Sequence, residues 1–329
     1  MKDPSSNTGP TVLPGAAGSM PYVGIASFMK SPIVTAAMLS NFDFVIVGIP
    51  FDEGTSNRPG ARFGPRGVRA ASALYSYEGG AELFDIELGR TILEGARLGD
   101  FGDVRIEPLD GDANRAAMTA AVAAVLAAGA IPVCVGGDHS VTAPILRAHA
   151  AARGDSLPYL VHLDTHMDFD SYGSRHYHGT PVRRSVEDRS VCGVTQVGIR
   201  GFNSGKTDWE EARALGVQVI TCSEFKSAGV QRVLETVPAG APLYLSIDID
   251  AFDPSIAPGT GTPEPGGLTY LEGRELLRAL ARHGDVVGID LVEVSPPYDH
   301  AECTSILASR LLLDLMGAVW DNGEEKGSR

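Results

Sequence analysis

Acidic and imidazole side chains recur at every second position in two short segments of this chain. The segment HLDTHMD contains Asp164, His166 and Asp168, and the segment SIDID contains Asp248 and Asp250. Alternate residues of an extended chain point to the same side, so we expect each segment to present these groups on one face. Carboxylate oxygens and imidazole nitrogens are common ligands of divalent cations. The spacing therefore predicts that both segments bind metal.

The segment GGDHS adds His139, so that the set contains four carboxylates and two imidazoles. One cation does not need so many charged ligands, whereas a pair of divalent cations does, and such a pair activates water for hydrolysis. Oxygen-rich ligation without a thiolate favours manganese over zinc, with nickel, cobalt or iron as alternatives. We therefore predict two Mn²⁺ ions per subunit, bound by His139, Asp164, His166, Asp168, Asp248 and Asp250.

A purely structural role is the alternative explanation for these residues. Asp138 and His139 stand where they could cap a following helix, because Asp and His at strand ends often act as caps or turn formers. Two like charges on one face, as at Asp248 and Asp250, repel each other unless a cation lies between them. We therefore favour metal binding for the set as a whole.

Short apolar runs alternate with helix-length segments along most of the chain. Residues 43–48, 131–136, 159–164, 193–199, 217–221, 242–248 and 286–292 are expected as strands. Residues 114–128, 141–152, 207–215, 271–282 and 305–319 are expected as helices. This alternation is typical of a mainly parallel sheet covered by helices on both faces. Ligands in such folds bind at the carboxyl ends of the strands, where His139, Asp164, Asp248 and Glu293 fall.

Length and composition indicate one acidic catalytic domain. No linker divides the 329 residues, so we expect a flexible segment over residues 1–20 and a single domain over 21–329. A formal net charge of −14 argues against nucleic acid or anionic membranes as partners. We find no apolar run of about 18 residues that could span a membrane.

Two further features favour a cytoplasmic location. The N-terminal segment has no apolar stretch typical of a secretory signal. The four cysteines are widely spaced and form no C-x-x-C pair, as expected in a reducing compartment.

Several motifs, taken together and in this order, resemble those of the ureohydrolases, the family of arginases, agmatinases, guanidinobutyrases and proclavaminate amidinohydrolase. They are GARFGP, GGDHS, DTHMD, SIDIDAFDP, GTGTP and GGLT, and the resemblance runs from about residue 43 to 319. GARFGP resembles the agmatinase-like branch in particular. Thr165 departs from the usual Ala, on a side that we expect to face away from the metal.

The resemblance implies a three-layer α/β/α sandwich with a mostly parallel eight-stranded sheet, and a homo-oligomer, either a trimer or a hexamer. It implies that His139 and Asp168 bind the first manganese and that His166 and Asp250 bind the second. Asp164 and Asp248 would then bridge the two ions.

The expected reaction is hydrolysis of a guanidino group to urea and an amine, by attack of a hydroxide that bridges the two metals. Asp168 would also accept a hydrogen bond from this hydroxide. His178, in HGTP, matches the acid/base histidine of the family, and an ordinary pKa near 6.5 suits that role. Glu293 matches the glutamate that binds the guanidinium. An exposed loop position for His178 and a salt bridge for Glu293 are the structural alternatives.

The loop over residues 169–177 is the first candidate for reading the far end of a small linear substrate, either agmatine or a guanidino acid such as 4-guanidinobutanoate. Arg175 and His176 favour an acid, Asp170 favours an amine, and Tyr172 is a candidate for packing the alkyl spacer. Asn203 stands where arginases carry an Asp for the substrate's amino group.

Three other functions are possible alternatives for this protein: an arginase, a single-zinc deacetylase of the same broad fold, and an inactive oligomeric scaffold. The loop departures disfavour the arginase. The complete ligand set, together with His178 and Glu293, disfavours the deacetylase and the scaffold.

Overall fold

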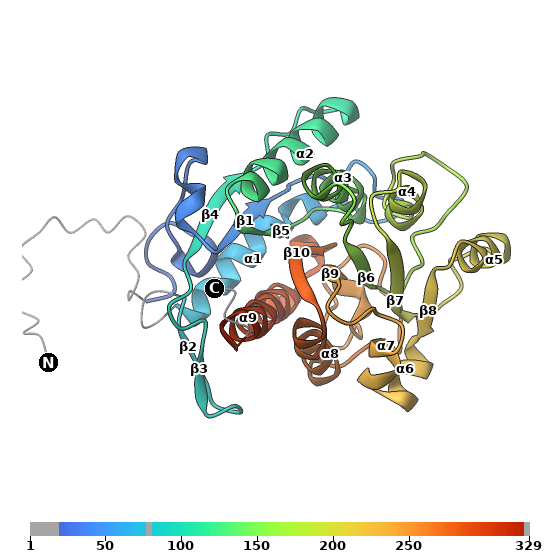
Figure 1. Cartoon of the computed structure of the whole chain (residues 1–329). Coiled ribbons are helices and arrows are strands. Elements are labelled where there is room, and N and C mark those ends of the chain that lie inside the picture. Colours follow the sequence, from blue (N-terminus) through green and yellow to red (C-terminus); the bar gives the residue numbers. More distant parts are fainter. Residues whose placement is uncertain (1–19, 77–80, 326–329) are drawn as a thin grey trace, which may run out of the picture.

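A parallel eight-stranded sheet forms the centre of the computed structural model, which describes residues 20–76 and 81–325 (Figure 1). The strands lie in the order β4-β1-β5-β10-β9-β6-β7-β8, and every neighbouring pair is parallel. Their bounds are β1 Phe44–Gly48, β4 Leu98–Asp103, β5 Ile131–Val135, β6 Tyr159–Leu163, β7 Gly193–Ile199, β8 Gln218–Thr221, β9 Pro242–Asp248 and β10 Asp285–Val292. The expected segment 1–20 lies outside the described residues, except for Met20.

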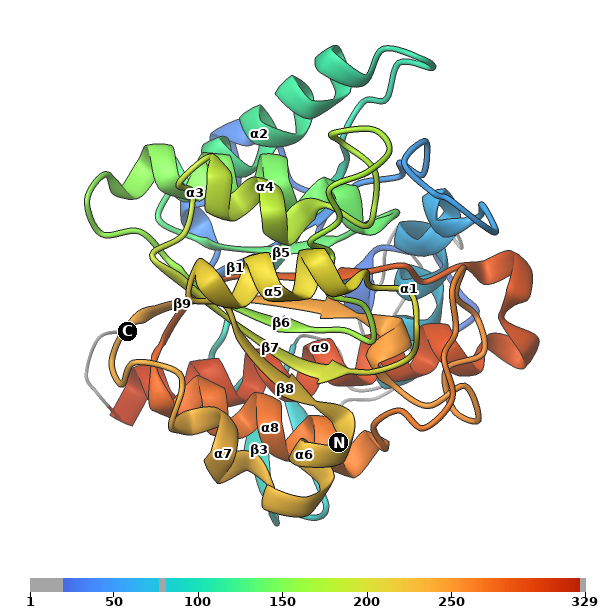
Figure 2. The same ribbon diagram turned by 90° about the vertical axis from the view of Figure 1, so that its right-hand side faces the viewer.

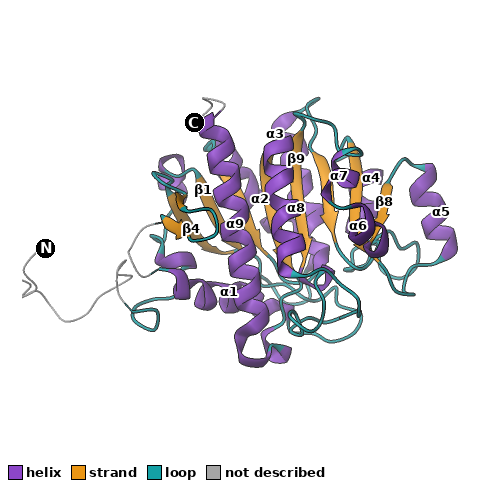
Figure 3. Ribbon diagram, turned by 90° about the horizontal axis from the view of Figure 1, so that it is seen from below, coloured by secondary structure: helices purple, strands orange, loops and turns teal. Residues whose placement is uncertain are grey.

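Helices cover both faces of the sheet, so the predicted three-layer α/β/α fold is confirmed (Figures 2 and 3). One layer contains α2 Gly111–Ala127, α3 Thr142–Arg153, α4 Pro181–Glu187 and α5 Lys206–Ala214. The other contains α1 Gly64–Ser72, α6 Cys222–Ala228, α7 Val230–Leu234, α8 Tyr270–His283 and α9 Cys303–Glu325.

Strand β1 shows why the sheet needs both layers. All five of its residues are buried. Phe44 and Ile46 belong to the core cluster beneath α8 and α9, whereas Val45 and Val47 belong to the cluster beneath α2 and α3. Successive side chains of a strand point to opposite faces, so a strand that is apolar at every position must be covered on both sides.

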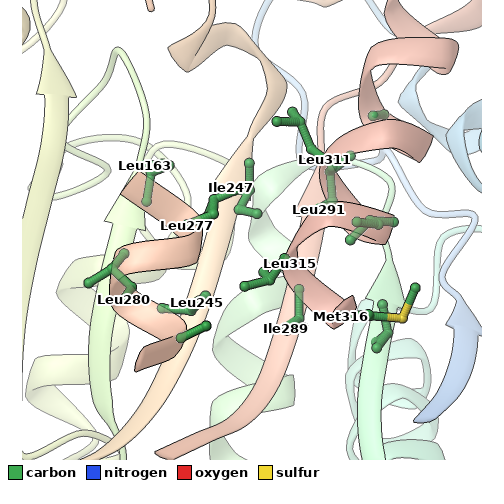
Figure 4. Packing of buried hydrophobic residues seen from close by; sticks show 14 of the residues in the cluster. Leu163, Leu245, Ile247, Leu277, Leu280, Ile289, Leu291, Leu311, Leu315 and Met316 are labelled. Atoms are coloured by element: carbon green, nitrogen blue, oxygen red, sulfur yellow. The ribbon is translucent and has the colours of Figure 1, made fainter. Parts of the chain in front are cut away.

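The centre of the sheet packs against α8 and α9 (Figure 4). Leu245 and Ile247 of β9 and Ile289 and Leu291 of β10 lie in one cluster with leucines of both helices. Complete burial of such a side chain contributes about 1.5–3 kcal/mol relative to exposure. These two strands therefore provide a rigid base for the residues that follow them.

From the sequence we expected no segment that could span a membrane, and helix α9 does not fit this expectation. The segment His300–Gly323 is long and apolar enough by composition, with a mean hydropathy of 1.3. However, 83% of its apolar window is buried inside the protein. Packing against α1 and α8 accounts for this apolar composition, as it does for core helices in general.

Candidate metal centre and cavity

The predicted metal ligands and Glu293 lie at the carboxyl ends of four strands that are neighbours in the sheet, in the order β5-β10-β9-β6. His139 opens a short 3-10 helix, η6 (His139–Val141), after β5, and Asp164 directly follows β6. Asp248 ends β9, and Glu293 directly follows β10. The edge of the sheet expected from the sequence is therefore where these residues meet.

The local backbone differs from the strand alternation that the spacing suggested. β6 ends at Leu163, so Asp164, His166 and Asp168 lie in a loop, and Asp250 lies in the 3-10 helix η7 (Ile249–Ala251). Asp164 Oδ1 accepts the backbone N–H of His166, and Asp168 has a positive φ of 49°. These side chains converge because Asp carboxylates can fold the chain back on itself in tight turns, and not because they share one face of a strand.

All six predicted ligands come together in two groups that share Asp164. In the first group, His139 Nδ1 lies 3.0 Å from Asp164 Oδ2 and 3.1 Å from both Asp168 Oδ2 and Asp248 Oδ2. In the second, His166 Nδ1 lies 3.4 Å from Asp164 Oδ1 and 3.3 Å from Asp250 Oδ2. The ligand atoms of His139, Asp164 and Asp168, together with one of His162, are close enough to hold one cation, and so are those of Asp164, His166 and Asp250.

The burial of these carboxylates fits a pair of cations. Asp164 Oδ2 and Asp168 Oδ2 are buried and have no hydrogen-bond partner among the described residues. Burial, together with the charges of Asp250 and Asp164, raises the pKa of Asp248 well above its ordinary value. Like charges packed this closely away from water need positive compensation, which divalent cations would supply. The mixture of oxygen and nitrogen donors suits manganese and its first-row neighbours.

His162 also belongs to the first group, although the sequence did not assign it as a ligand. Its Nε2 lies 3.1 Å from Asp164 Oδ2, but the two atoms are not aligned as a hydrogen bond. Its ring stacks on His139 with the centroids 4.8 Å apart. His162 therefore packs against one proposed ligand, His139, and lies close to another, Asp164, at the base of the site.

A buried polar network behind His139 was also missed from the sequence. His139 Nε2 lies 2.8 Å from Ser246 Oγ, which donates to Asp290 Oδ1 at 2.7 Å. Asp290 Oδ2 accepts the hydroxyl groups of Thr142 and Tyr244. This network leaves Nδ1 of His139 facing the carboxylates, and such partners generally set the orientation of a metal-binding histidine.

His178 and Glu293 form a pair beside the metal centre. His178 Nδ1 lies 2.9 Å from Glu293 Oε1, which also accepts the backbone N–H of His139 at 2.9 Å. Glu293 Oε2 is buried and unpartnered among the described residues. Burial lowers the pKa of His178, but its hydrogen bond to Glu293 and the charges of Glu293, Asp138 and Asp168 outweigh this and raise it to about 9.

A cavity of about 340 Å³ opens onto His178 and onto four of the predicted ligands, His139, His166, Asp168 and Asp248. Its predicted lining residues Tyr172 and Asn203 are present, and Asn203 Nδ2 lies 3.2 Å from His166 Nε2. Arg175 does not line the cavity. Its guanidinium lies 3.4 Å from Glu187 and 3.1 Å from Asp188, and its side chain is 54% exposed. The position of Arg175 therefore gives no support to its predicted role in substrate binding.

Ser56 and Asn57 line the cavity but were not predicted from the sequence. Ser56 Oγ lies 2.6 Å from His178 Nε2, and Asn57 donates to the carbonyl of Gly261. Both follow β1 in a polar segment. The rule that found the other residues, polar groups beyond the end of a buried strand, could therefore have found these as well.

Comparison with known proteins agrees with this geometry. The model of the arginase family matches residues 42–317, so the chain belongs to the arginase family, as its motifs implied. A guanidinopropionase from Pseudomonas aeruginosa is 38% identical, over 90% of this chain and 92% of that protein. A mitochondrial agmatinase from Gallus gallus is 37% identical, over 89% of this chain and 85% of its own.

A solved structure shares the whole fold. Proclavaminate amidinohydrolase from Streptomyces clavuligerus superimposes with a TM-score of 0.83 at 37% identity, covering 92% of this chain and 100% of that one. The names of these three relatives refer to different guanidino or amidino substrates. Membership of the family therefore leaves the substrate to be argued from the cavity.

Proposed function

We propose that this protein is a two-metal amidinohydrolase. It would hydrolyse the guanidino group of a small linear substrate, agmatine or a guanidino acid such as 4-guanidinobutanoate, to urea and an amine. The observation that carries this proposal is the pair of buried ligand groups sharing Asp164 at the base of the cavity. The hydrolase names of its relatives support the reaction class.

We propose manganese as the metal, with nickel, cobalt or iron as alternatives. His139, Asp164, Asp168 and Asp248 would hold one ion, and Asp164, His166, Asp248 and Asp250 the other. When bound, two such cations supply the Lewis acidity that makes water a nucleophile near neutral pH. The second ligand group distinguishes this site from that of a single-zinc deacetylase.

The protein's own side chains would bind the guanidinium and move protons. Glu293 Oε2 has no hydrogen-bond partner in the part of the chain that the structure describes, so it can accept an N–H of the planar guanidinium, an interaction that carboxylates favour. The unpartnered Asp168 Oδ2 can accept a hydrogen bond from the attacking water. His178, with a pKa of about 9, is protonated near neutral pH and can donate its proton to the departing amine.

Urea release tests this function directly. The manganese-loaded protein is assayed with agmatine, 4-guanidinobutanoate, 3-guanidinopropanoate, arginine and free guanidine. We expect urea from at least one compound and a loss of 100-fold or more in Asp248→Asn, in line with the roughly 10- to 100-fold or larger effects of disturbing metal sites. Asp112→Asn is the matched control, because the Asp112 side chain is fully exposed on α2. Full activity in Asp248→Asn would contradict the proposal.

We further propose a cytoplasmic homo-oligomer, either a trimer or a hexamer. The dispersed cysteines and the family resemblance support it, and light scattering of the purified protein would test the assembly.

A further inference from the structure

Away from the candidate metal centre, the described side chains that line the cavity include an acidic residue but no lysine or arginine. Once the metal ligands and His178 are set aside, Asp170 is the charged residue that remains among the described lining residues. The others are hydroxyl, amide and aromatic groups, such as Ser56, Asn57 and Tyr172. Neither lysine nor arginine is found in this lining. A carboxylate at the far end of a substrate would therefore meet no cationic partner there.

Asp170 is held in place by its loop. Its backbone N–H donates to the carbonyl of Gly179 at 3.0 Å, and its Oδ2 accepts the hydroxyl of Tyr177. A Cβ at Gly179 would stand 2.6 Å from Asp170 Oδ2 and 2.9 Å from the Tyr177 ring. The absence of a side chain at position 179 is thus what allows the carboxylate and the phenol to meet.

Two aromatic rings accompany this carboxylate. The centroids of Tyr172 and Tyr177 lie 6.2 Å apart, and Tyr177 contacts His178 edge-on at 5.8 Å. Tyr172 is 59% exposed, which places it at the mouth of the cavity. Aromatic faces attract ammonium groups, and a carboxylate adds direct charge attraction. We call Asp170, Tyr172 and Tyr177 the distal wall.

The distal wall lies within reach of a short substrate. Asp170 follows Asp168 by two residues, so their Cα atoms are at most about 7 Å apart. A guanidinium at Glu293 and the metal centre, extended by a spacer of a few carbons, therefore ends near Asp170. Arg175 and His176 were the loop residues suited to a carboxylate. Arg175 is directed to Glu187 and Asp188 instead, and His176 does not belong to the cavity lining.

We infer that the distal wall binds a cationic end group, so that an alkylguanidine ending in a primary ammonium is the preferred substrate class over guanidino acids. This inference rests on the proposed function and narrows it. The attraction is between the Asp170 carboxylate and the ammonium group of the substrate, so it does not involve the metal centre.

Three substrates with the same four-carbon chain separate the possibilities on the manganese-loaded, full-length protein. They are agmatine, butylguanidine and 4-guanidinobutanoate, which end in a cation, a methyl group and an anion. We expect kcat/KM for agmatine to exceed both others by about 10- to 100-fold, the range for a hydrogen bond to a charged group. Urea release with an equal or greater kcat/KM for the acid would overturn the inference and leave the proposed function standing. If neither these three compounds nor any compound of the wider panel released urea, both the inference and the proposed function would be overturned.

Substitutions then test the residue itself. In Asp170→Asn we expect kcat/KM for agmatine to fall about 10- to 100-fold, mainly through KM, while butylguanidine changes less than about twofold. Asp112→Asn, an exposed carboxylate on α2, is the matched control. An equal loss for all three substrates would show a merely structural role and refute the assignment. If Asp170→Asn does not fold, inhibition of the unaltered protein decides: 1,4-diaminobutane should inhibit more strongly than 4-aminobutanoate, and the reverse order would refute it.

Discussion

At the scale of residues, the six candidate metal ligands could be chosen from the sequence, but the reason why their side chains converge could not. Their spacing of two suggested one face of a strand, whereas Asp164 turns the chain by accepting the N–H of His166. The same pattern of letters serves both geometries, because an Asp after a strand readily forms such a turn. The contacts of Ser246 and Asp290 behind His139 could not be predicted for another reason. Both residues lie inside apolar strands, and their spacing in the sequence does not indicate that they are partners of His139.

The pair of His178 and Glu293 makes stability depend on pH. The folded pKa of His178, about 9, lies above its ordinary value of 6.5, so the pair stabilises the fold fully below pH 6.5 and loses this effect as pH rises through 9. We expect the metal-free protein to exceed His178→Gln in unfolding free energy by about 2–3 kcal/mol near pH 6, and by much less near pH 10. Urea unfolding at the two pH values measures this. A difference that does not change with pH would contradict the assignment.

Gly137 occupies a position at which no side chain fits. A Cβ at this position would lie 1.6 Å from the carbonyl oxygen of Phe51, which also accepts the N–H of Asp138. We expect Gly137→Ala to cost 3 kcal/mol or more, since overpacking against rigid backbone commonly costs about 1–3 kcal/mol and occasionally more. Gly205→Ala is the control, because its nearest neighbour is the Asp208 side chain at 3.3 Å. Thermal unfolding of both variants gives the comparison, and equal midpoints would refute the expectation.

At the scale of elements, the apolar strands and long helices were found from the sequence, and the least regular elements were not. The observed β7 and β9 match their predicted ranges residue for residue. Edge strand β4 has the sequence LGDFGD, in which glycine and aspartate hide the apolar pattern, and parallel pairing with β1 is what makes it a strand. Helices α4, α6 and α7 are short, so they show too few turns for a 3.6-residue period to appear.

Helix α9 should behave as a core helix. Leu311 is fully buried against the sheet, whereas Leu271 on α8 is 61% exposed. We expect Leu311→Ala to lower the unfolding free energy by about 2–5 kcal/mol, and Leu271→Ala to change it by less than about 0.5 kcal/mol. Denaturant unfolding measures both. A small effect at Leu311 would mean that α9 is not packed as the structure shows.

At the scale of the whole molecule, the proposed metal centre would join segments at the ends of three central strands, β5, β6 and β9. Metal that binds only the folded protein raises its stability by about 2.7 kcal/mol when free metal is 100-fold above the dissociation constant. We expect the melting temperature to rise with added manganese and to respond much less in Asp164→Asn, since Asp164 belongs to both ligand groups. Exposed Asp112→Asn should respond as the unaltered protein does. An unchanged response in Asp164→Asn would argue against a shared carboxylate.

The two ends of the cavity differ in how many other residues a substitution there would disturb. Glu293 Oε1 holds both the His139 backbone and the His178 ring, so a change at this proposed guanidinium-binding residue would also disturb His139 and His178. Asp170 is tied mainly to Tyr177 and Gly179 within its own loop. New substrates are therefore best sought by exchanging this loop while the reaction chemistry is left untouched.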